Sequence, residues 1–543
     1  AAMTNPPDEL RYGLDRLIAT GKRIFGWGWV AHSARRATDV HLCVEGDGWA
    51  RRLQADFGLA RHDVMEAFPH LRDAASSGFI VTGFLPEGTR RAAKLQVQFD
   101  DGSSTEIDVA AAIEARDTRR RKWRQLAYVA RALWRRLKRG DFAGILRRAR
   151  AQSYAATTLD DWGIVEELVP TLRESRQTWL VFDHNMGGGA NQYRRALIAE
   201  RVAAGDAVVF CTYNLPMLEY RLHVYQQERE ERVFRISTFL VLEPLFHELG
   251  AVQVFVNSPV SFEEPLVLAE WLASMRSQHP DARLTVTVHD YFTACPSFVL
   301  LDADGRHCGV PSTSECAACL PRHEASYVSL SPPSEIPVWR RSWGRCLAAA
   351  DEVRCFSEAS RRLMLRAYPN LPQDHVTLVP HRSDFMPARL PRIDASAPLV
   401  IGVVGEISPQ KGAGIVTGIV EIIERERLDA RVVVIGTLDA ACNSPGLATT
   451  GRYDREKLPE LIEANGVNMF LFSSIWPETF SYVVAELMAL QVPVVAFDLG
   501  APAERLRTYP MGRLCGEVSA KAALDTLTGF HAELAKAQMA RVA

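Results

Sequence analysis

Two glutamates in the C-terminal third of the sequence have a spacing that suits a shared ligand. Glu478 and Glu486 stand in the stretch WPETFSYVVAELMALQVPVVAFDLGAPAE, residues 476–504, with seven residues between them. On a helix, eight positions at about 100° each leave two side chains roughly 80° apart, so both carboxylates can face one cleft. The alternative is a pair of unrelated surface glutamates on an amphipathic helix.

The residues around this pair predict the elements that hold it. Pro477 precedes the helix, where its missing N–H costs nothing, and Thr479 or Ser481 can cap the first turn. The run 492–497, VPVVAF, is too apolar for a half-exposed strand and indicates a parallel sheet covered on both faces. The predicted helix before this strand has an apolar stripe, which comprises Phe480, Val483, Val484, Leu487 and Met488.

Other residues with chemical potential follow predicted strands. Gly187, Gly188 and Gly189 come directly after the buried strand 179–183, where glycine lets backbone N–H groups approach phosphate or sugar. A plain flexible turn is the alternative. His289 and Asp290 end the strand 284–288, and ligand-facing residues gather at such carboxyl ends.

Strands and helices alternate from residue 178 onward, which predicts an α/β fold with two doubly wound sheets. The first sheet has its boundary near 387–398, where Pro, Ala and Arg dominate. The strands expected are 179–183, 207–212, 252–256, 284–288, 399–405 and 430–436, and the helices are 193–204, 238–249, 264–277 and 413–425. A ligand would bind between the two halves, at the carboxyl ends of both sheets.

The residues before this region have a different pattern. Four short alternating runs, at 26–30, 38–43, 78–83 and 94–99, predict a small β-sandwich over 1–113. It could hold glycan or a partner chain, or be a spacer without a ligand.

A basic amphipathic helical linker is predicted over 114–160. Residues 116–150 hold fourteen Lys and Arg against two Asp, a local net charge of +12, whereas the whole chain carries −2. Contact with an anionic membrane surface and a solvated linker helix are equally favoured interpretations. Nucleic-acid binding is disfavoured, because no aromatic platform or known motif accompanies the charge.

Composition narrows the class of protein. The chain has 543 residues, 47% of them hydrophobic, so several domains with substantial cores are expected. No apolar run is long enough to span a bilayer, and the first residues have no apolar signal region. Ten cysteines in so long a chain do not indicate a disulfide scaffold, so a cytoplasmic location is expected. If the basic segment contacts a membrane, the protein would lie at the inner face of the cytoplasmic membrane.

Four of these cysteines raise a separate hypothesis. Cys316 and Cys319 have C-x2-C spacing, and Cys295 and Cys308 precede them closely. Four thiolates would make a closed structural zinc site that fixes the loop after His289. Four unlinked cysteines are the alternative.

The motifs together resemble the family 4 retaining glycosyltransferases of the GT-B fold, of the type that builds bacterial surface polysaccharides. Glu478 and Glu486 are similar to that family's E-x7-E signature, and ELMALQVPVVAFDLGAPAE to its usual continuation. The string VHDYFTACPSF, residues 288–298, resembles a subgroup of these enzymes. The resemblance covers roughly 177–520 and implies two Rossmann-like domains, 161–395 on the acceptor side and 396–543 on the donor side.

The resemblance also implies roles for single residues. Glu478 would hold hydroxyls of the donor sugar, Glu486 the ribose, and His289 would face the sugar while Asp290 binds acceptor. The diphosphate would lie at the helix N-terminus, and Arg452 in a loop that contacts the base. The resemblance implies that the glycine loop, residues 187–189, touches the donor diphosphate or the acceptor. The residues implied in binding the donor are Gly188, Gly189, Gly405, Lys411, Thr479, Phe480 and Ser481.

One position departs from the family pattern. Glu406 stands where the family often has Arg, which removes an expected partner of the phosphates. Lys411 would then carry more of the charge compensation, or Arg382, Arg452 or another base would substitute. A terminal helix near 518–540 is expected to pack back onto the first half, as in related folds.

The function implied is transfer of a hexosyl unit from a nucleotide-diphosphate sugar to a hydroxyl of a growing glycan in lipopolysaccharide, O-antigen or capsule, with retention of configuration. The acceptor would be a glycan or a lipid-linked glycan. No D-x-D motif stands in the predicted cleft elements, so no catalytic metal is expected. The alternatives are a nucleotide-sugar epimerase and a non-catalytic scaffold of a polysaccharide assembly complex. The sequence specifies neither donor, acceptor nor oligomeric state.

Overall fold

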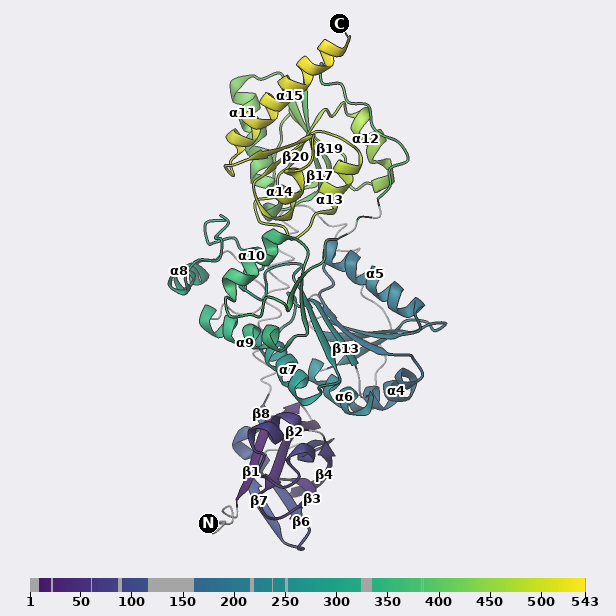
Figure 1. Ribbon diagram of the computed structural model, residues 1–543, viewed down its shortest axis with the longest axis vertical. Helices are drawn as coiled ribbons and strands as arrows, with labels where there is room; N and C mark the ends of the chain where they lie inside the picture. The colour runs from purple at the N-terminus through teal and green to yellow at the C-terminus, as the bar shows by residue number, and fades with distance from the viewer. Residues whose placement is uncertain are drawn as a thin grey trace. The chain divides into compact units, whose positions relative to one another are not determined.

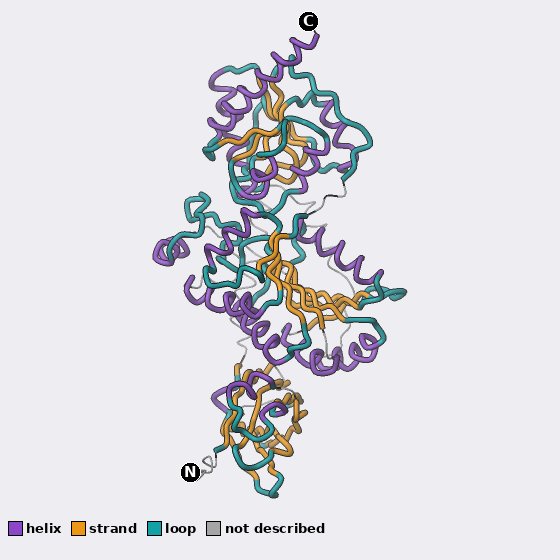
Figure 2. The backbone as a smooth tube through the Cα atoms, in the orientation of Figure 1, coloured by secondary structure: helices purple, strands orange, loops and turns teal. Residues whose placement is uncertain are grey.

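The computed structural model describes residues 9–20, 23–59, 61–85, 90–115, 161–214, 219–236, 238–249, 252–323, 335–381, 383 and 385–542 (Figures 1 and 2). The basic segment 116–150, with its predicted membrane contact, lies outside these residues. None of the described helices is long and apolar enough to cross a membrane.

The N-terminal domain is all β, apart from one short helix and two 3-10 turns. Its eight strands hydrogen-bond in the order β7-β6-β3-β4-β5-β2-β1-β8. Leu17 of β1 and Ile107 of β7 lie near opposite ends of this order yet belong to one core, so the sheet curves around that core. The elements are β1 Leu10–Thr20, β2 Arg23–His32, β3 Ala37–Gly46, β4 Trp49–Leu59, α1 His62–Ala67, β5 Gly78–Phe84, β6 Arg90–Phe99, β7 Ser104–Asp108 and β8 Glu114–Ala115.

The first α/β sheet has eight strands in the order β12-β11-β10-β9-β13-β14-β15-β16. In β9, three consecutive residues, Leu180, Val181 and Phe182, are fully buried, as expected for a strand covered on both faces. The elements are α4 Asp161–Arg173, β9 Thr178–Asp183, α5 Gly189–Ala203, β10 Ala207–Asn214, β11 Glu219–Tyr225, β12 Arg232–Ile236, α6 Glu243–Leu249, β13 Val252–Ser258, α7 Pro265–Gln278, β14 Arg283–Thr287, α8 Thr313–Cys319, α9 Ile336–Ala349, β15 Glu352–Cys355, α10 Glu358–Ala367 and β16 Val376–Leu378.

Four strands of this sheet, β11, β12, β15 and β16, were not predicted. β11 and β12 are antiparallel to their neighbours and extend the sheet beyond β10. Along β11, Tyr220, Leu222 and Val224 are buried, and polar residues stand between them, so a period of two is present in the sequence. The expectation of strict β/α alternation passed over it.

The second α/β sheet has six strands in the order β19-β18-β17-β20-β21-β22, and its neighbouring strands pair in parallel. The predicted strands 399–405 and 430–436 lie within β17 and β18, and the predicted helix 413–425 lies within α11. The elements are β17 Leu399–Ile407, α11 Ala413–Glu426, β18 Ala430–Leu438, β19 Leu447–Thr449, α12 Leu458–Ala464, β20 Met469–Phe472, α13 Tyr482–Ala489, β21 Val494–Phe497, α14 Gly500–Leu506, β22 Gly512–Cys515 and α15 Ala520–Val542.

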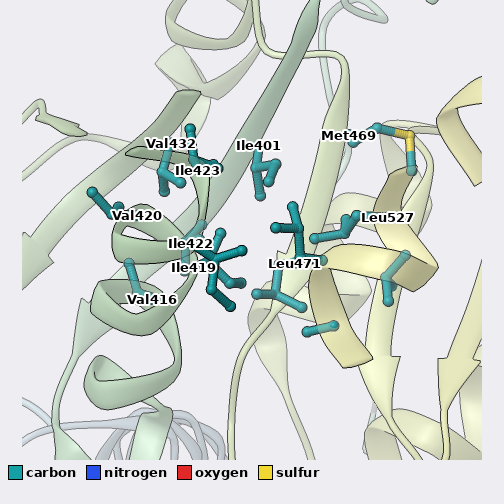
Figure 3. Packing of buried hydrophobic residues seen from close by; sticks show 14 of the residues in the cluster. Ile401, Val416, Ile419, Val420, Ile422, Ile423, Val432, Met469, Leu471 and Leu527 are labelled. Carbon is teal, nitrogen blue, oxygen red and sulfur yellow. The ribbon is translucent and has the colours of Figure 1, made fainter. Parts of the chain in front are cut away.

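Alternate side chains of these strands enter two different cores. Ile401 of β17 packs with Val416 of α11 and Leu527 of α15 in the cluster seen in Figure 3. Val400, the residue directly before Ile401, faces the opposite way and packs with Leu487 of α13. Because strand side chains alternate between faces, both faces of this sheet are covered by helices.

The terminal helix corrects one expectation. α15 contacts α11 and the strands β17, β20, β21 and β22, so it packs on the second sheet and completes its core rather than returning to the first half. The apolar residues Ala523, Leu524, Leu527 and Phe530 recur at helical spacing and all enter that core, which explains the placement.

Compactness divides the chain into two units. One comprises Ala1–Val181, Ile198–Val254 and Trp271–Leu284, and the other Phe182–Leu197, Phe255–Glu270 and Thr285–Ala543. Every residue of the site described below belongs to the second unit.

Candidate functional site

A pocket of about 430 Å³ lies beside the N-terminal end of α13. It is termed the α13 pocket here, and its wall comes from three places: the start of α5, the end of β17 with the loop after it, and residues 471–483. The lining residues are Gly188, Gly189, Gln192, Arg195, Val403, Val404, Ile407, Lys411, Leu471, Phe472, Ser473, Ser474, Glu478, Phe480, Ser481, Tyr482 and Val483.

The two candidate caps of α13 have different roles. Ser481 is the N-cap, and its Oγ accepts a hydrogen bond from Val484 N at 3.2 Å. The hydroxyl of Thr479 instead donates to the backbone carbonyl of His289 at 2.9 Å. The capped helix presents the N–H groups of its first turn at the pocket, an arrangement that favours an anion.

Glu478 is a buried acid at the mouth of this helix. It is 6% exposed, and its Oε1 is buried without a hydrogen-bond partner. Burial raises the pKa of its carboxyl group, while the positive charge of Lys411 and the hydroxyl of Ser474 act in the opposite direction. A buried carboxylate oxygen with no partner in the protein is suited to receive a hydroxyl group from a ligand.

Lys411 is brought to this carboxylate by a close backbone approach. A Cβ added to Gly412, whose φ is +84°, would lie 1.9 Å from the carbonyl oxygen of Ser473. The Oγ of Ser473 also donates to the carbonyl of Lys411 at 2.7 Å. Only glycine fits at 412, so loop 408–412 packs against the end of β20 and Lys411 reaches the pocket.

Gly405 stands at the same end of β17, with φ at +117°, and approaches Val483 of α13. It lies behind the pocket rather than in its lining. Its positive φ, rather than a lack of space, is what favours glycine at this point.

Glu486 lies deeper along α13 and outside the α13 pocket lining. It is 7% exposed, and its charge, together with burial, raises the pKa of the Tyr453 phenol. Glu478 and Glu486 are thus both buried, but Glu478 lines the pocket and Glu486 lies near Tyr453. Two separate positions of this kind fit a ligand with two polar ends.

His289 and Asp290 follow β14, and hydrogen bonds to backbone carbonyls join their segment to Pro477 and Thr479. Beside the Thr479 bond, the hydroxyl of Tyr291 donates to the carbonyl of Pro477 at 2.8 Å. The Nε2 of His289 is buried without a hydrogen-bond partner, and burial holds the pKa of the imidazole well below its usual value. The ring is therefore neutral at physiological pH.

Asp290 is engaged within the fold. Its Oδ2 accepts from Ser258 Oγ at 2.5 Å and its Oδ1 from Phe292 N at 2.8 Å. Burial raises its pKa to about 6. Both oxygens hold the loop after His289, so the geometry supports a positioning role more directly than the predicted contact with acceptor.

A cluster of rings around His381 was not predicted. Its ring stacks on Phe480 at 4.5 Å between centroids and lies 5.5 Å from the ring of His289 and 4.8 Å from that of Tyr193. Burial lowers the pKa of His381 to about 4. A lone histidine after a short strand carries no signal in the sequence, so only the structure could place it here.

Hydrogen bonds and an ion pair hold the glycine loop, residues 187–189, at the end of β9. Gly187 N donates to Asn191 Oδ1 at 2.6 Å, and the Nδ2 of Asn191 donates to Asp183 at 3.0 Å. Arg194 forms a buried ion pair with Asp183 at 2.9 Å. This network holds Gly188 and Gly189 in the pocket wall, where Gly189 approaches the ring of Tyr482.

Glu406, which stands where the family often has arginine, forms an ion pair in the structure. Its Oε1 accepts from Arg452 Nη2 at 3.1 Å, and both side chains are largely exposed. Neither lines the α13 pocket. Arg452, expected as a substitute for the arginine that the family often has at position 406, is instead paired with Glu406 itself. Arg382 lies outside the described residues.

The four cysteines lie near one another. Cys295 and Cys316 pack in one small cluster, and the thiols of Cys308 and Cys319 are close enough for their charges to affect neighbouring thiol pKa values. Across the described ranges, however, no group of three or more His, Cys, Asp or Glu side chains is arranged to hold a metal ion. The geometry gives no support to the zinc hypothesis, which stays a prediction.

The sequence of the second α/β region matches a known family. Residues 398–529 match the family model described as glycosyl transferases group 1. Comparison with curated proteins finds no match.

Solved structures give distant likenesses. The crystal structure of Anabaena Alr3699/HepE in complex with UDP and glucose is 15% identical, with 65% of this chain and 89% of that chain covered and a TM-score of 0.41. Sucrose-phosphate synthase from Thermosynechococcus elongatus is 16% identical, with 68% and 98% covered and a TM-score of 0.40. The lipopolysaccharide outer core galactosyltransferase WaaB is 10% identical, with 65% and 90% covered and a TM-score of 0.39.

The order of the sheets along the chain indicates the class of fold. Two Rossmann-like α/β sheets follow one another along the sequence, and the second coincides with the family match. That succession is the GT-B class of fold. Lys411, Glu478 and Glu486 lie within residues 398–529, which match the glycosyl transferases group 1 model.

Proposed function

We propose that the protein is a retaining glycosyltransferase that moves a hexosyl unit from a nucleotide-diphosphate sugar to a hydroxyl of a growing surface glycan. The observation that carries the proposal is the buried Glu478 carboxylate, whose Oε1 has no partner, beside Lys411 and the capped N-terminus of α13. This group of residues lies inside the region that matches the glycosyltransferase family model.

The residues have complementary tasks in such a reaction. Leaving of the nucleotide places growing negative charge on the diphosphate, and the N–H groups of α13 with the ammonium of Lys411 would stabilise it. Glu478 would accept hydrogen bonds from hydroxyls of the donor sugar and so fix its orientation. Glu486, near Tyr453, would hold the ribose.

His289 suits a place beside the transferred sugar. Its ring is neutral, and the buried Nε2 is free to exchange a hydrogen bond with a sugar hydroxyl. The bond from Thr479 to the carbonyl of His289 couples that ring to the motif that carries Glu478. Correct placement of one therefore depends on the other.

The first experiment is a thermal-shift panel of UDP, GDP, dTDP and their sugars on wild type, Glu486→Ala and Glu406→Gln. A nucleotide at about 100 times its Kd should stabilise wild type by roughly 2.7 kcal/mol. Glu486→Ala should lose this stabilisation, whereas Glu406→Gln, which alters an exposed residue outside the pocket, should keep it.

Transfer is then measured with the donor so found and a set of glycan acceptors, and the anomeric configuration of the product is read by NMR. Retained configuration supports the proposal. Binding with a changed sugar and no acceptor would favour an epimerase. A folded wild type that no nucleotide stabilises would overturn the proposal and favour a scaffold.

A further inference from the structure

We infer that Arg195 binds the diphosphate of the nucleotide-sugar donor and replaces the phosphate partner that is missing at Glu406. The inference rests on the proposed function and names a residue on which neither the sequence pattern nor the family match bears. Arg195 belongs to α5, in the first α/β region, whereas the matched family region begins at residue 398.

The helix places this side chain on the pocket face. Gly188, Gly189, Gln192 and Arg195 line the α13 pocket, and residues three apart on a helix share one face. The preceding residue, Arg194, points elsewhere and is buried in its ion pair with Asp183. Two adjacent arginines thus have different tasks, one in the fold and one at the pocket.

The positive charge of Lys411 is too small to balance a diphosphate in this pocket, so a second basic side chain is expected to contribute. Lys411 and Arg195 are the two basic side chains among its described lining residues, and Lys411 lies beside the carboxylate of Glu478. Arg452, the substitute considered from the sequence, is paired with Glu406 outside the lining. A diphosphate carries more negative charge than one lysine next to a carboxylate can balance.

Arg195 has the chemistry that this task needs. A guanidinium group binds two phosphate oxygens at once through parallel N–H donors, which an ammonium group cannot do. Within the described part of the chain no carboxylate pairs with Arg195, whereas Arg201 on the same helix pairs with Glu200. The group is therefore available to an anionic ligand.

The test uses the full chain and inorganic pyrophosphate, so that it does not depend on which base the donor carries. Binding is measured by isothermal titration calorimetry for wild type, Arg195→Gln, Arg195→Lys and the control Arg425→Gln. Arg425 is an exposed arginine of α11 paired with Glu426. It matches the change in charge without touching the pocket.

Arg195→Gln should weaken pyrophosphate binding at least tenfold, Arg195→Lys should restore part of it, and Arg425→Gln should match wild type. The same variants are titrated with UDP and UMP, GDP and GMP, and dTDP and dTMP. Preference for diphosphate over monophosphate should fall markedly in Arg195→Gln.

Two outcomes would overturn the inference: no pyrophosphate binding by folded wild type, or equal affinities in wild type and Arg195→Gln. Pyrophosphate binding that depends on Arg195, together with no binding of any nucleotide, would uphold the anion site and reject the proposed transferase. The two failures are therefore distinguishable.

Discussion

The carboxyl group of Glu478 occupies a place where its charge is unfavourable for folding. Because burial raises its pKa above the unfolded value, the group favours the folded state at low pH and that benefit is lost as the pH rises through the folded pKa. A neutral isostere removes this penalty. Function and stability should therefore respond in opposite directions at this residue.

We expect Glu478→Gln to raise the melting temperature at pH 8 and to abolish transfer. Differential scanning fluorimetry and the transfer assay measure the two effects on one preparation. Glu406→Gln, which alters an exposed acid, should change neither. A melting temperature that falls in Glu478→Gln would show that the carboxylate has a partner that stabilises the fold.

The buried histidines of the site should make the free energy of unfolding depend on pH. Burial lowers the pKa of His381 to about 4 and holds that of His289 well below 6.5. In each case the unfolded chain binds a proton that the folded chain does not, so the free energy of unfolding falls as the pH decreases below about 6.5. The effect amounts to about 1 kcal/mol per pH unit for each histidine.

His381→Phe isolates one of these contributions. Urea unfolding at pH 7, 6 and 5 should show a decline in stability that is shallower in the variant than in wild type by about 1 kcal/mol per pH unit. Phenylalanine keeps a ring against Phe480 and His289, which face His381. Parallel declines in the two proteins would mean that His381 is protonated in the folded state.

At the scale of elements, two glycines near the start of α11 should respond oppositely to the same change. Gly412→Ala places a Cβ 1.9 Å from a backbone oxygen at φ +84°, whereas the Cβ at Gly414 would meet nothing within 4 Å. We expect Gly412→Ala to destabilise the protein and weaken nucleotide binding, because Lys411 is displaced.

Gly414→Ala should stabilise by about 0.5–1 kcal/mol, since alanine is the better helix former. Chemical denaturation of both variants, with nucleotide titration, provides the comparison. Equal effects at the two positions would show that the approach of loop 408–412 to Ser473 is not constrained.

Some of the helices and strands could be predicted from the sequence and others could not. The cap at Ser481, the strand β21 and the helix α11 follow from capping chemistry and from apolar runs that are local in the sequence. The antiparallel strand β11 was passed over because an expected β/α alternation outweighed its own period of two. The packing of α15 was misplaced because a long amphipathic helix does not specify which sheet it covers.

Some residues of the candidate site could also be predicted from the sequence, and others could not. Glu478 and Lys411 could be predicted because motifs with a physical role surround them. Arg195 and His381 could not, since one is an arginine on an exposed helix face and the other a lone histidine in a connecting segment. Their places at the pocket and in the ring cluster depend on neighbours far away in the chain, such as Phe480 for His381, and a single sequence does not contain that information.

At the scale of the molecule, two hydrogen bonds join segments almost 190 positions apart in the chain. Thr479 donates to the carbonyl of His289 and Tyr291 to that of Pro477. We expect Thr479→Val and Tyr291→Phe each to lower stability by about 1 kcal/mol. In a double-mutant cycle their effects should be non-additive, because each bond holds the other's segment in place.

The transfer rate should fall in both single variants, since His289 and Glu478 lose their common support. Thr508→Val, which removes a hydroxyl that bonds only to the nearby carbonyl of Arg505, serves as control. Strict additivity with an unchanged rate would show that the two segments keep their places independently.

The packing of α15 has a consequence for biosynthesis. Leu527 and Phe530 fill the same core as Ile401 of β17, whose codon is translated more than a hundred residues earlier (Figure 3). Until α15 has left the ribosome, α11 covers only part of this face of the second sheet, and the apolar side chains that α15 would cover stay exposed to solvent. Such surfaces recruit chaperones or aggregate. Yield of the folded protein should therefore depend on translation speed and chaperone supply over this last stretch more than over any earlier part of the sheet.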